Sequence, residues 1–206
     1  MTGRKHIFIT GSRGSGKSHL VNNMLKHMSD SFNLLQSHRT DTPQVVIKSN
    51  LVADNKEFVI GVPRTSGINP ASKGNNMIII EDGFINCAIP AINTHLDTTP
   101  EKLFVIDELG YLESACIPFQ KAVEKLLDNS HVLAVIRKQS TEFLNRICNR
   151  KDVLVIDIDS TFETLSCIIM ASGMSKRFGS NKLITDFNER SLFENAVSIS
   201  HFAGFG

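Results

Sequence analysis

Short apolar runs alternate along the chain with segments whose apolar residues recur at helical spacing. Four runs rich in Ile, Val, Leu and Phe predict buried strands at residues 5–10, 103–106, 131–136 and 153–158. Apolar positions at helical spacing predict three helices, marked by Leu20, Val21, Met24, Leu25 and Met28, by Cys116, Phe119, Val123, Leu126 and Leu127, and by Phe143, Leu144 and Ile147. Repeated strand–helix units predict an α/β fold, a mainly parallel sheet with helices on both faces.

The first strand and helix are joined by Gly-Ser-Arg-Gly-Ser-Gly-Lys-Ser, which matches the P-loop pattern G-x-x-x-x-G-K-S. Glycines let successive backbone N–H groups point into one concavity, and the positive end of the following helix adds to its attraction for phosphate. A chance glycine turn is the alternative, but the strand and helix on either side favour the P-loop. The residues expected to bind the triphosphate are Gly11, Ser12, Arg13, Gly14, Ser15, Gly16, Lys17 and Ser18. Lys17 is expected to be catalytic through the β- and γ-phosphates, and Ser18 to be a ligand of Mg²⁺.

Two carboxylates, Asp107 and Glu108, follow the buried run 103–106. Parallel strands bring their carboxyl ends to one edge of a sheet, where a P-loop also lies. We therefore expect Asp107 to hold Mg²⁺ opposite Ser18, and Glu108 to orient and deprotonate the attacking water. The alternative, a solvated strand end or a helix cap, would be preferred without the P-loop. Arg137 and Lys138 end another strand at this edge, where they could reach the γ-phosphate or simply be solvated.

The pattern is less regular between the first helix and residue 103. Residues 29–42 are predicted to form a loop, and residues 64–76, rich in Gly, Asn, Ser and Pro, a second, exposed loop. Short strands are predicted at 44–48, 57–62 and 77–80, followed by a helix around 87–95. The three strands predict a small β-insertion lying beside the nucleotide.

Composition narrows the functional classes only a little. A chain of 206 residues has room for one full domain and part of another. A net charge of +1 gives no general electrostatic reason to bind nucleic acid or an anionic membrane. No apolar run approaches transmembrane length, so we expect a cytoplasmic protein. Four widely spaced cysteines predict buried thiols rather than disulfides or a metal site.

Three stretches together resemble the cancer-related nucleoside-triphosphatase family over residues 5–165. They are the P-loop, V-I-D-E-L-G-Y-L-E at 105–113 with Phe119 in the next helix, and V-L-A-V-I-R-K at 132–138. The resemblance implies a P-loop fold and hydrolysis of several nucleoside triphosphates with Mg²⁺. It also implies phosphate and magnesium contacts at Gly11, Gly14, Gly16, Lys17 and Ser18, and metal and water contacts at Asp107 and Glu108. Between residues 33 and 76 the family's arginine- and glycine-rich segment is poorly matched, which leaves base recognition open.

A second resemblance begins after residue 166. Residues 167–171 are strand-like, and residues 172–183 are similar to the signature A-x-G-x-S-x-R-x-G-x-x-K of MobA-like nucleotidyltransferases, which attach a nucleotide to the molybdenum cofactor. The match offers Gly173 and Gly179 for backbone access, and Arg177 and Lys182 for a triphosphate. A basic surface loop is the alternative. About forty residues are too few for an independent core, so we expect an incomplete transferase segment that does not catalyse.

The sequence thus predicts a nucleoside-triphosphatase domain at residues 1–165 and an incomplete MobA-like segment at 166–206. The predicted reaction is Mg²⁺-dependent hydrolysis of ATP or GTP to diphosphate and phosphate, linked to molybdenum-cofactor nucleotide metabolism. The partners expected are nucleoside triphosphates and molybdenum-cofactor enzymes, without nucleic acid or membrane; the oligomeric state is open. Alternatives are a small-molecule or nucleotide kinase and a nucleotide-binding adaptor for molybdenum-cofactor biosynthesis. A longer parent protein could be a molybdenum-cofactor nucleotidyltransferase.

Overall fold

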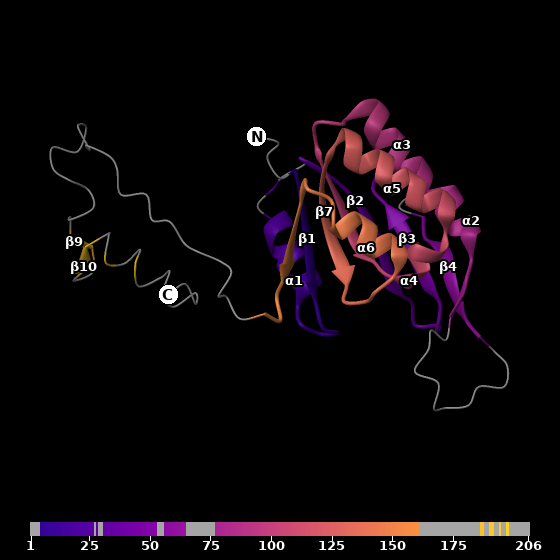
Figure 1. Ribbon diagram of the computed structural model, residues 1–206, viewed down its shortest axis with the longest axis horizontal. Helices are drawn as coiled ribbons and strands as arrows, with labels where there is room; N and C mark the ends of the chain where they lie inside the picture. Colours follow the sequence, from indigo (N-terminus) through magenta and orange to yellow (C-terminus); the bar gives the residue numbers. More distant parts are fainter. Residues whose placement is uncertain are drawn as a thin grey trace. The chain divides into compact units, whose positions relative to one another are not determined.

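The computed structural model describes residues 5–26, 28, 31–52, 56–64, 77–160, 186–187, 190–191, 194 and 197 (Figure 1). The chain divides into two compact units, Met1–Asp159 and Ser160–Gly206. Of the loop predicted at 64–76, residues 65–76 lie outside the described residues, as do the predicted strand at 167–171 and the nucleotidyltransferase-like motif at 172–183. The domain division expected at residue 165 remains a prediction.

One eight-stranded sheet organises the first unit, in the order β5-β4-β3-β2-β6-β7-β1-β8 (Figure 1). Its strands are β1 His6–Gly11, β2 Phe32–Arg39, β3 Val45–Ser49, β4 Phe58–Pro63, β5 Met77–Ile79, β6 Leu103–Leu109, β7 His131–Arg137 and β8 Val153–Asp157. The neighbouring strands β2, β6, β7, β1 and β8 pair with one another in parallel. On the other side of β2, the strands β3, β4 and β5 extend the sheet through antiparallel pairs. This mixed, mostly parallel sheet confirms the predicted α/β class. The predicted β-insertion is therefore an extension of the main sheet itself.

Helices cover both faces of the sheet because alternate strand residues point to opposite sides. The helical segments are α1 Lys17–Leu25, α2 Glu81–Gly83, the π-helical η2 Phe84–Ala88, α3 Ile89–Thr98, α4 Tyr111–Ala115, α5 Ile117–Asn129 and α6 Glu142–Cys148. On β6, Phe104 and Ile106 join the core under α3, α5 and α6, whereas Val105 joins the core under α1. The predicted helices at 116–127 and 143–147 are present as α5 and α6.

Helix α1 buries a narrower stripe than its apolar residues suggested. Val21 and Leu25 are buried against β1, β6 and β7. Leu20 and Met24, predicted to share that face, are each 40% exposed. Because the helix follows the P-loop directly, its buried face consists of Lys17, Val21 and Leu25. The third buried residue is thus the P-loop lysine and not another apolar residue.

The prediction of a loop at 29–42 is wrong, since Phe32–Arg39 forms β2 and pairs in parallel with β6. The segment contains polar residues at positions that face the core, so its sequence lacks the apolar pattern of a buried strand. The buried Asn33 amide donates a hydrogen bond of 2.8 Å to His95 Nδ1 and one of 2.8 Å to Thr99 Oγ1. A side chain from α3, distant in sequence, therefore satisfies a polar group inside the sheet.

The helix predicted at 87–95 begins earlier, at Glu81, and runs through α2, η2 and α3 to Thr98. Gly83 permits this start, because a Cβ at that position would lie 2.3 Å from the Val59 carbonyl oxygen on β4. The close approach of helix and strand closes the core over the antiparallel part of the sheet.

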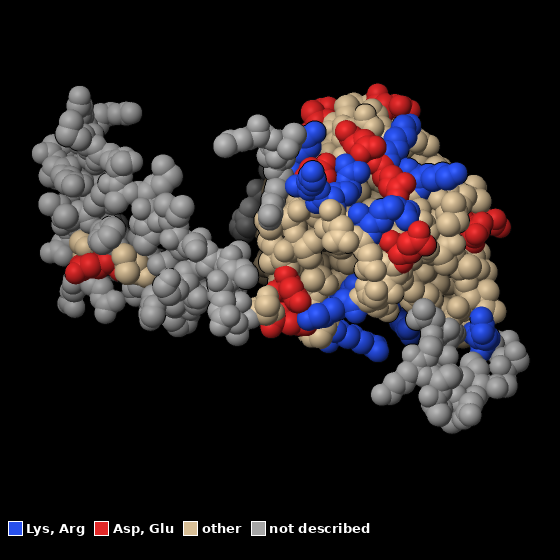
Figure 2. All heavy atoms as spheres, in the orientation of Figure 1, with Lys and Arg blue, Asp and Glu red and all other residues tan. Residues whose placement is uncertain are grey.

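In the second unit the described residues form one short antiparallel pair, β9 Asp186–Phe187 with β10 Arg190–Ser191. Ser191 donates hydrogen bonds from its backbone nitrogen and its hydroxyl to Glu194 Oε2, at 2.8 and 2.9 Å. Within the described part of the chain, no helix has the length and apolar character needed to cross a bilayer. On the face of the first unit seen in Figure 2, basic and acidic side chains lie interspersed.

Candidate active site

The P-loop connects the end of β1 to the start of α1, as the sequence predicted. Gly14 and Gly16 have φ values of 80° and 91°, in the left-handed region that favours glycine. At Gly11 the constraint is close packing: a Cβ there would lie 2.8 Å from both Ile158 Cγ1 and Ser15 Oγ. The glycines of the motif are thus required by the backbone path of the loop.

Lys17 is the first residue of α1, and its side chain folds back into the loop. Its ammonium donates hydrogen bonds of 2.8 Å to the Gly11 carbonyl and 2.7 Å to the Ser12 carbonyl. The residue is only 8% exposed. The ammonium group of Lys17 is thus buried within the P-loop. An anionic ligand that enters the loop could replace the carbonyl oxygens as its hydrogen-bond acceptor.

Ser18 and Asp107, predicted as a metal-binding pair, are adjacent in the structure. The Ser18 hydroxyl donates a hydrogen bond of 3.0 Å to Asp107 Oδ1. Asp107 is buried at the end of β6, and burial raises the pKa of its carboxyl group while the hydrogen bond from Ser18 lowers it. A hydroxyl and a carboxylate are oxygen ligands of the kind that Mg²⁺ prefers. A buried carboxylate also gains from a neighbouring cation, so the two residues fit a magnesium ion.

Glu108 follows Asp107 on β6, and its carboxylate accepts a hydrogen bond from Arg137 Nε at the end of β7. The stem of Arg137 lies over Gly110, where a Cβ would come within 2.9 Å of Arg137 Cδ. Because Gly110 leaves this space, the guanidinium can reach across from one strand to the next. The structure therefore places the predicted base in an ion pair at the sheet edge.

Glu113 stabilises the turn at Gly110, between β6 and α4. Its side chain is buried, and Oε2 accepts a hydrogen bond of 2.9 Å from the Gly110 backbone nitrogen at the start of α4. Burial raises the pKa of this carboxyl group to about 7. The resemblance stretch 105–113 included Glu113, but the sequence did not assign it a function. Its position indicates that it fixes the turn on which Arg137 rests.

Asp157 ends β8, and Asp159, two residues further on, contacts the P-loop. Asp159 accepts hydrogen bonds from Ser12, 2.5 Å from the backbone nitrogen and 2.9 Å from the hydroxyl. Lys138, considered above as a phosphate contact, pairs with Asp157 at 2.8 Å and with Asp159 at 3.2 Å. Neither carboxylate was identified from the sequence. Asp157 and Asp159 lie at the end of the strand predicted at 153–158, so their position resembles that of Asp107 and could have pointed to them.

A cavity of about 350 Å³ opens beside Glu108. Four cationic side chains line it, Arg13 of the P-loop, Arg39 at the end of β2, Arg137 and Lys138, together with Gly14 and Gln139. Arg39 was not identified from the sequence, because it lies in the segment predicted as a loop.

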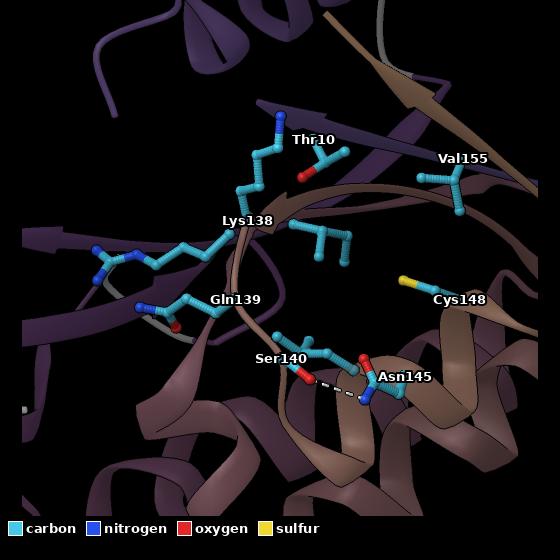
Figure 3. A pocket seen from close by; sticks show the side chains of 10 residues that line it. Thr10, Lys138, Gln139, Ser140, Asn145, Cys148 and Val155 are labelled. Carbon is cyan, nitrogen blue, oxygen red and sulfur yellow. Dashed lines mark hydrogen bonds between the residues drawn. The ribbon is translucent and has the colours of Figure 1, made fainter. Parts of the chain in front are cut away.

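A second pocket, of about 330 Å³, lies on the other side of residues 137–139, toward α6 (Figure 3). Thr10, Val155 and the Cys148 thiol line it, and across it Asn145 Nδ2 donates a hydrogen bond of 3.0 Å to Ser140 Oγ. Cys87, Cys116 and Cys148 are free thiols, as expected; Cys148 is only half-buried. The two pockets share the segment that carries Arg137 and Lys138.

A family model described as NTPase matches residues 6–163. The nucleoside-triphosphatase THEP1 of Thermotoga sp. (strain RQ2) is 26% identical over 155 residues, covering 74% of this chain and 86% of that protein. The protein of the same name from Thermotoga maritima is 23% identical over 154 residues, with coverage of 74% and 86%.

Two solved structures share the fold. The crystal structure of THEP1 from Aquifex aeolicus aligns with a TM-score of 0.61 at 17% identity, covering 78% of this chain and 93% of that one. The solution structure of a human cancer-related nucleoside triphosphatase aligns with a TM-score of 0.55 at 17% identity, covering 97% and 98%. At these identities the alignments establish the arrangement of strands and helices.

Proposed function

Because the chain belongs to the NTPase family and is a nucleoside-triphosphatase, we propose that it hydrolyses nucleoside 5′-triphosphates, such as ATP or GTP, to diphosphate and phosphate with Mg²⁺ at the P-loop. The observation that carries the proposal is the meeting of Ser18 with Asp107 at 3.0 Å, with Glu108 as the next residue of β6. One small region thus combines a P-loop, a pair of candidate metal ligands and a candidate base, which supports the proposal.

Nucleotide binding would replace the internal contacts of Lys17. The ammonium that now donates to the Gly11 and Ser12 carbonyls would turn to β- and γ-phosphate oxygens, which carry more charge and form stronger hydrogen bonds. Backbone N–H groups of the loop and the start of α1 would surround the same phosphates. Asp159 holds the loop in place through its hydrogen bonds from Ser12.

Ser18 and Asp107 would hold the magnesium ion. When bound, Mg²⁺ neutralises charge on the β- and γ-phosphate oxygens. Asp107 suits this role because it is buried at a strand end, where its position is set by the sheet and its charge lacks full solvation.

Glu108 would orient the attacking water and accept its proton. Its side chain is 22% exposed, so water can reach it, and the ion pair with Arg137 restricts its orientation. The Arg137 guanidinium lies close enough to this carboxylate to meet charge that develops on the transferred phosphoryl group.

The proposed link to molybdenum-cofactor nucleotide metabolism has a separate basis. It rests on the sequence of residues 172–183 alone, because the family match ends at residue 163.

Phosphate release from ATP, GTP, CTP and UTP, measured with Mg²⁺ and again with EDTA, tests the proposed reaction. Release of inorganic phosphate that requires the divalent cation supports hydrolysis. A γ-phosphate that appears only on an added acceptor would indicate a kinase instead. Tight nucleotide binding with negligible turnover would indicate an adaptor.

A further inference from the structure

The cavity beside Glu108 adjoins the P-loop and shares two of its residues, Arg13 and Gly14. Its walls come from Arg13 and Gly14 at the tip of the P-loop, Arg39 of β2, Glu108 of β6 and residues 137–139 after β7. Among the described residues that line it, Lys17, Ser18 and Asp107 are absent. The cavity therefore borders the candidate base but not the lysine or the two candidate metal ligands.

Its charge is unbalanced. Arg137 pairs with Glu108, and Lys138 pairs with two carboxylates outside the cavity lining. Arg13 and Arg39 are exposed, and neither forms an ion pair within the part of the chain that the structure describes. Two arginines without a partner that face one cavity attract anions. The planar guanidinium fork matches phosphate oxygens in particular.

The sheet brings these arginines together from different strands. β6 lies between β2 and β7, so Arg39 and Arg137 end the two strands that flank Glu108. Tyr111, just after β6, lies within the electrostatic influence of both arginines. Burial raises the pKa of its phenol, whereas the positive charges of Arg137 and Arg39 lower it. The two guanidinium groups therefore converge on the same region of the sheet edge.

The cavity is larger than one attacking water requires. One water occupies about 30 Å³ of liquid volume, so a single nucleophilic water would leave most of the 350 Å³ free. Pockets for small ligands begin at about 300 Å³. A positively charged cavity of this size next to the terminal phosphate has room for a second anionic group.

We propose that Arg13 and Arg39 form a second anion subsite, which binds a phosphate group beside the γ-phosphate of the nucleotide. This rests on the proposed function, since the nucleotide must occupy the P-loop. The phosphate group has two sources: inorganic phosphate released by hydrolysis, or the phosphate of a second molecule that also carries a hydroxyl. In the latter case the hydroxyl oxygen bonds to the γ-phosphorus as the bond to the bridging oxygen breaks. Its proton passes to Glu108, and nucleoside diphosphate leaves.

Calorimetric titration of inorganic phosphate tests the subsite directly. The full chain is first saturated with Mg²⁺ and a non-hydrolysable triphosphate analogue, whose own binding is measured. Arg13→Ala and Arg39→Ala should each weaken phosphate binding by about tenfold or more, because each removes a charged hydrogen-bond donor. Arg39→Lys should lose less. The matched control is Arg146→Ala, an exposed arginine of α6 that pairs with Glu124, which should bind phosphate like the wild type.

The outcomes separate this inference from the proposed function. If the analogue does not bind the wild type, the P-loop assignment is at fault and the subsite with it. If the analogue binds but phosphate does not, or if phosphate binds Arg39→Ala and Arg13→Ala as tightly as the wild type, the subsite alone is contradicted.

A labelling experiment distinguishes the two sources. Triphosphate labelled at the γ-position is incubated with glycerol 3-phosphate, and with glycerol as the uncharged control. Label transferred to glycerol 3-phosphate but not to glycerol identifies an acceptor subsite. Label found only in inorganic phosphate, together with the arginine-dependent phosphate binding above, identifies a product subsite.

Discussion

Ser18 Oγ lies 3.0 Å from Asp107 Oδ1, a contact between residues 89 positions apart in the chain. The two meet because β1 and β6 are both parallel neighbours of β7, so the P-loop and the end of β6 emerge at one edge of the sheet. A hydroxyl and a buried carboxylate thereby become one pair of oxygen ligands. The proposed requirement for Mg²⁺ follows from this pair.

Replacement Asp107→Asn tests that requirement. The amide keeps the size of the side chain but removes the charge, so the Mg²⁺ concentration for half-maximal phosphate release should rise by about tenfold or more. Thermal stability without metal should not fall, because burial disfavours the charge of Asp107. A variant with unchanged Mg²⁺ dependence would contradict the assignment.

Lys17→Ala should weaken both nucleotide binding and turnover. A hydrogen bond to a charged group contributes about 1.5–3 kcal/mol, so we expect affinity to fall by about tenfold to a hundredfold, measured with a fluorescent triphosphate. The control is Lys26→Ala, an exposed lysine just after α1 whose side chain, among the described residues, donates a hydrogen bond only to the Asn23 side chain. Equal affinity in the two variants would mean that the loop is not the nucleotide site.

The buried Glu113 gives a prediction on pH. Its pKa is about 7 in the folded protein against 4.5 as the ordinary value, so the folded state binds more protons than the unfolded state between these values. The contribution of Glu113 to the free energy of unfolding is therefore fully present below pH 4.5 and is lost as the pH rises toward 7. The span corresponds to about 3 kcal/mol at ~1.4 kcal/mol per pH unit.

Denaturant unfolding of wild type and Glu113→Gln, compared from pH 4.5 to 7.5, measures this effect. The glutamine can still accept the hydrogen bond from Gly110, so the variant should gain stability relative to the wild type as pH rises. A stability difference that does not change with pH would show that Glu113 does not titrate in this range.

Local patterns were sufficient wherever one short segment carries the whole signal. The P-loop needs glycine at positions of positive φ and lysine at the helix start, and these constraints lie within eight residues. The same is true of β6, whose apolar run ends in Asp107 and Glu108. These elements, and the meeting of Ser18 with Asp107, were predicted from the sequence.

The sequence was misleading where a distant partner decides the structure. β2 contains Asn33 inside the core, and only His95 and Thr99 of the α3 region make that position acceptable. Missing β2 also meant missing Arg39, whose place beside Glu108 depends on pairing between β2 and β6. The pairing of Lys138 with Asp157 and Asp159 likewise depends on β7 and β8 flanking β1.

Removing residues 167–206 tests whether the first unit works alone. The matched family region ends at residue 163, and the residues proposed for catalysis all precede it. We therefore expect phosphate release within about threefold of the full chain, since a tenfold loss requires ~1.4 kcal/mol of transition-state stabilisation. Loss of activity in a truncated protein that remains folded would show that the second unit contributes to the active site.

The central claim is that this P-loop site hydrolyses nucleoside triphosphates with Glu108 as the base, and Glu108→Gln tests it most directly. Phosphate release is measured under saturating nucleotide and Mg²⁺, alongside nucleotide binding. The amide keeps the size of the side chain but cannot accept the proton, so kcat should fall by ~10²–10⁴-fold while the nucleotide still binds. Near-normal kcat in a variant that binds nucleotide would contradict the assigned base and the mechanism built on it.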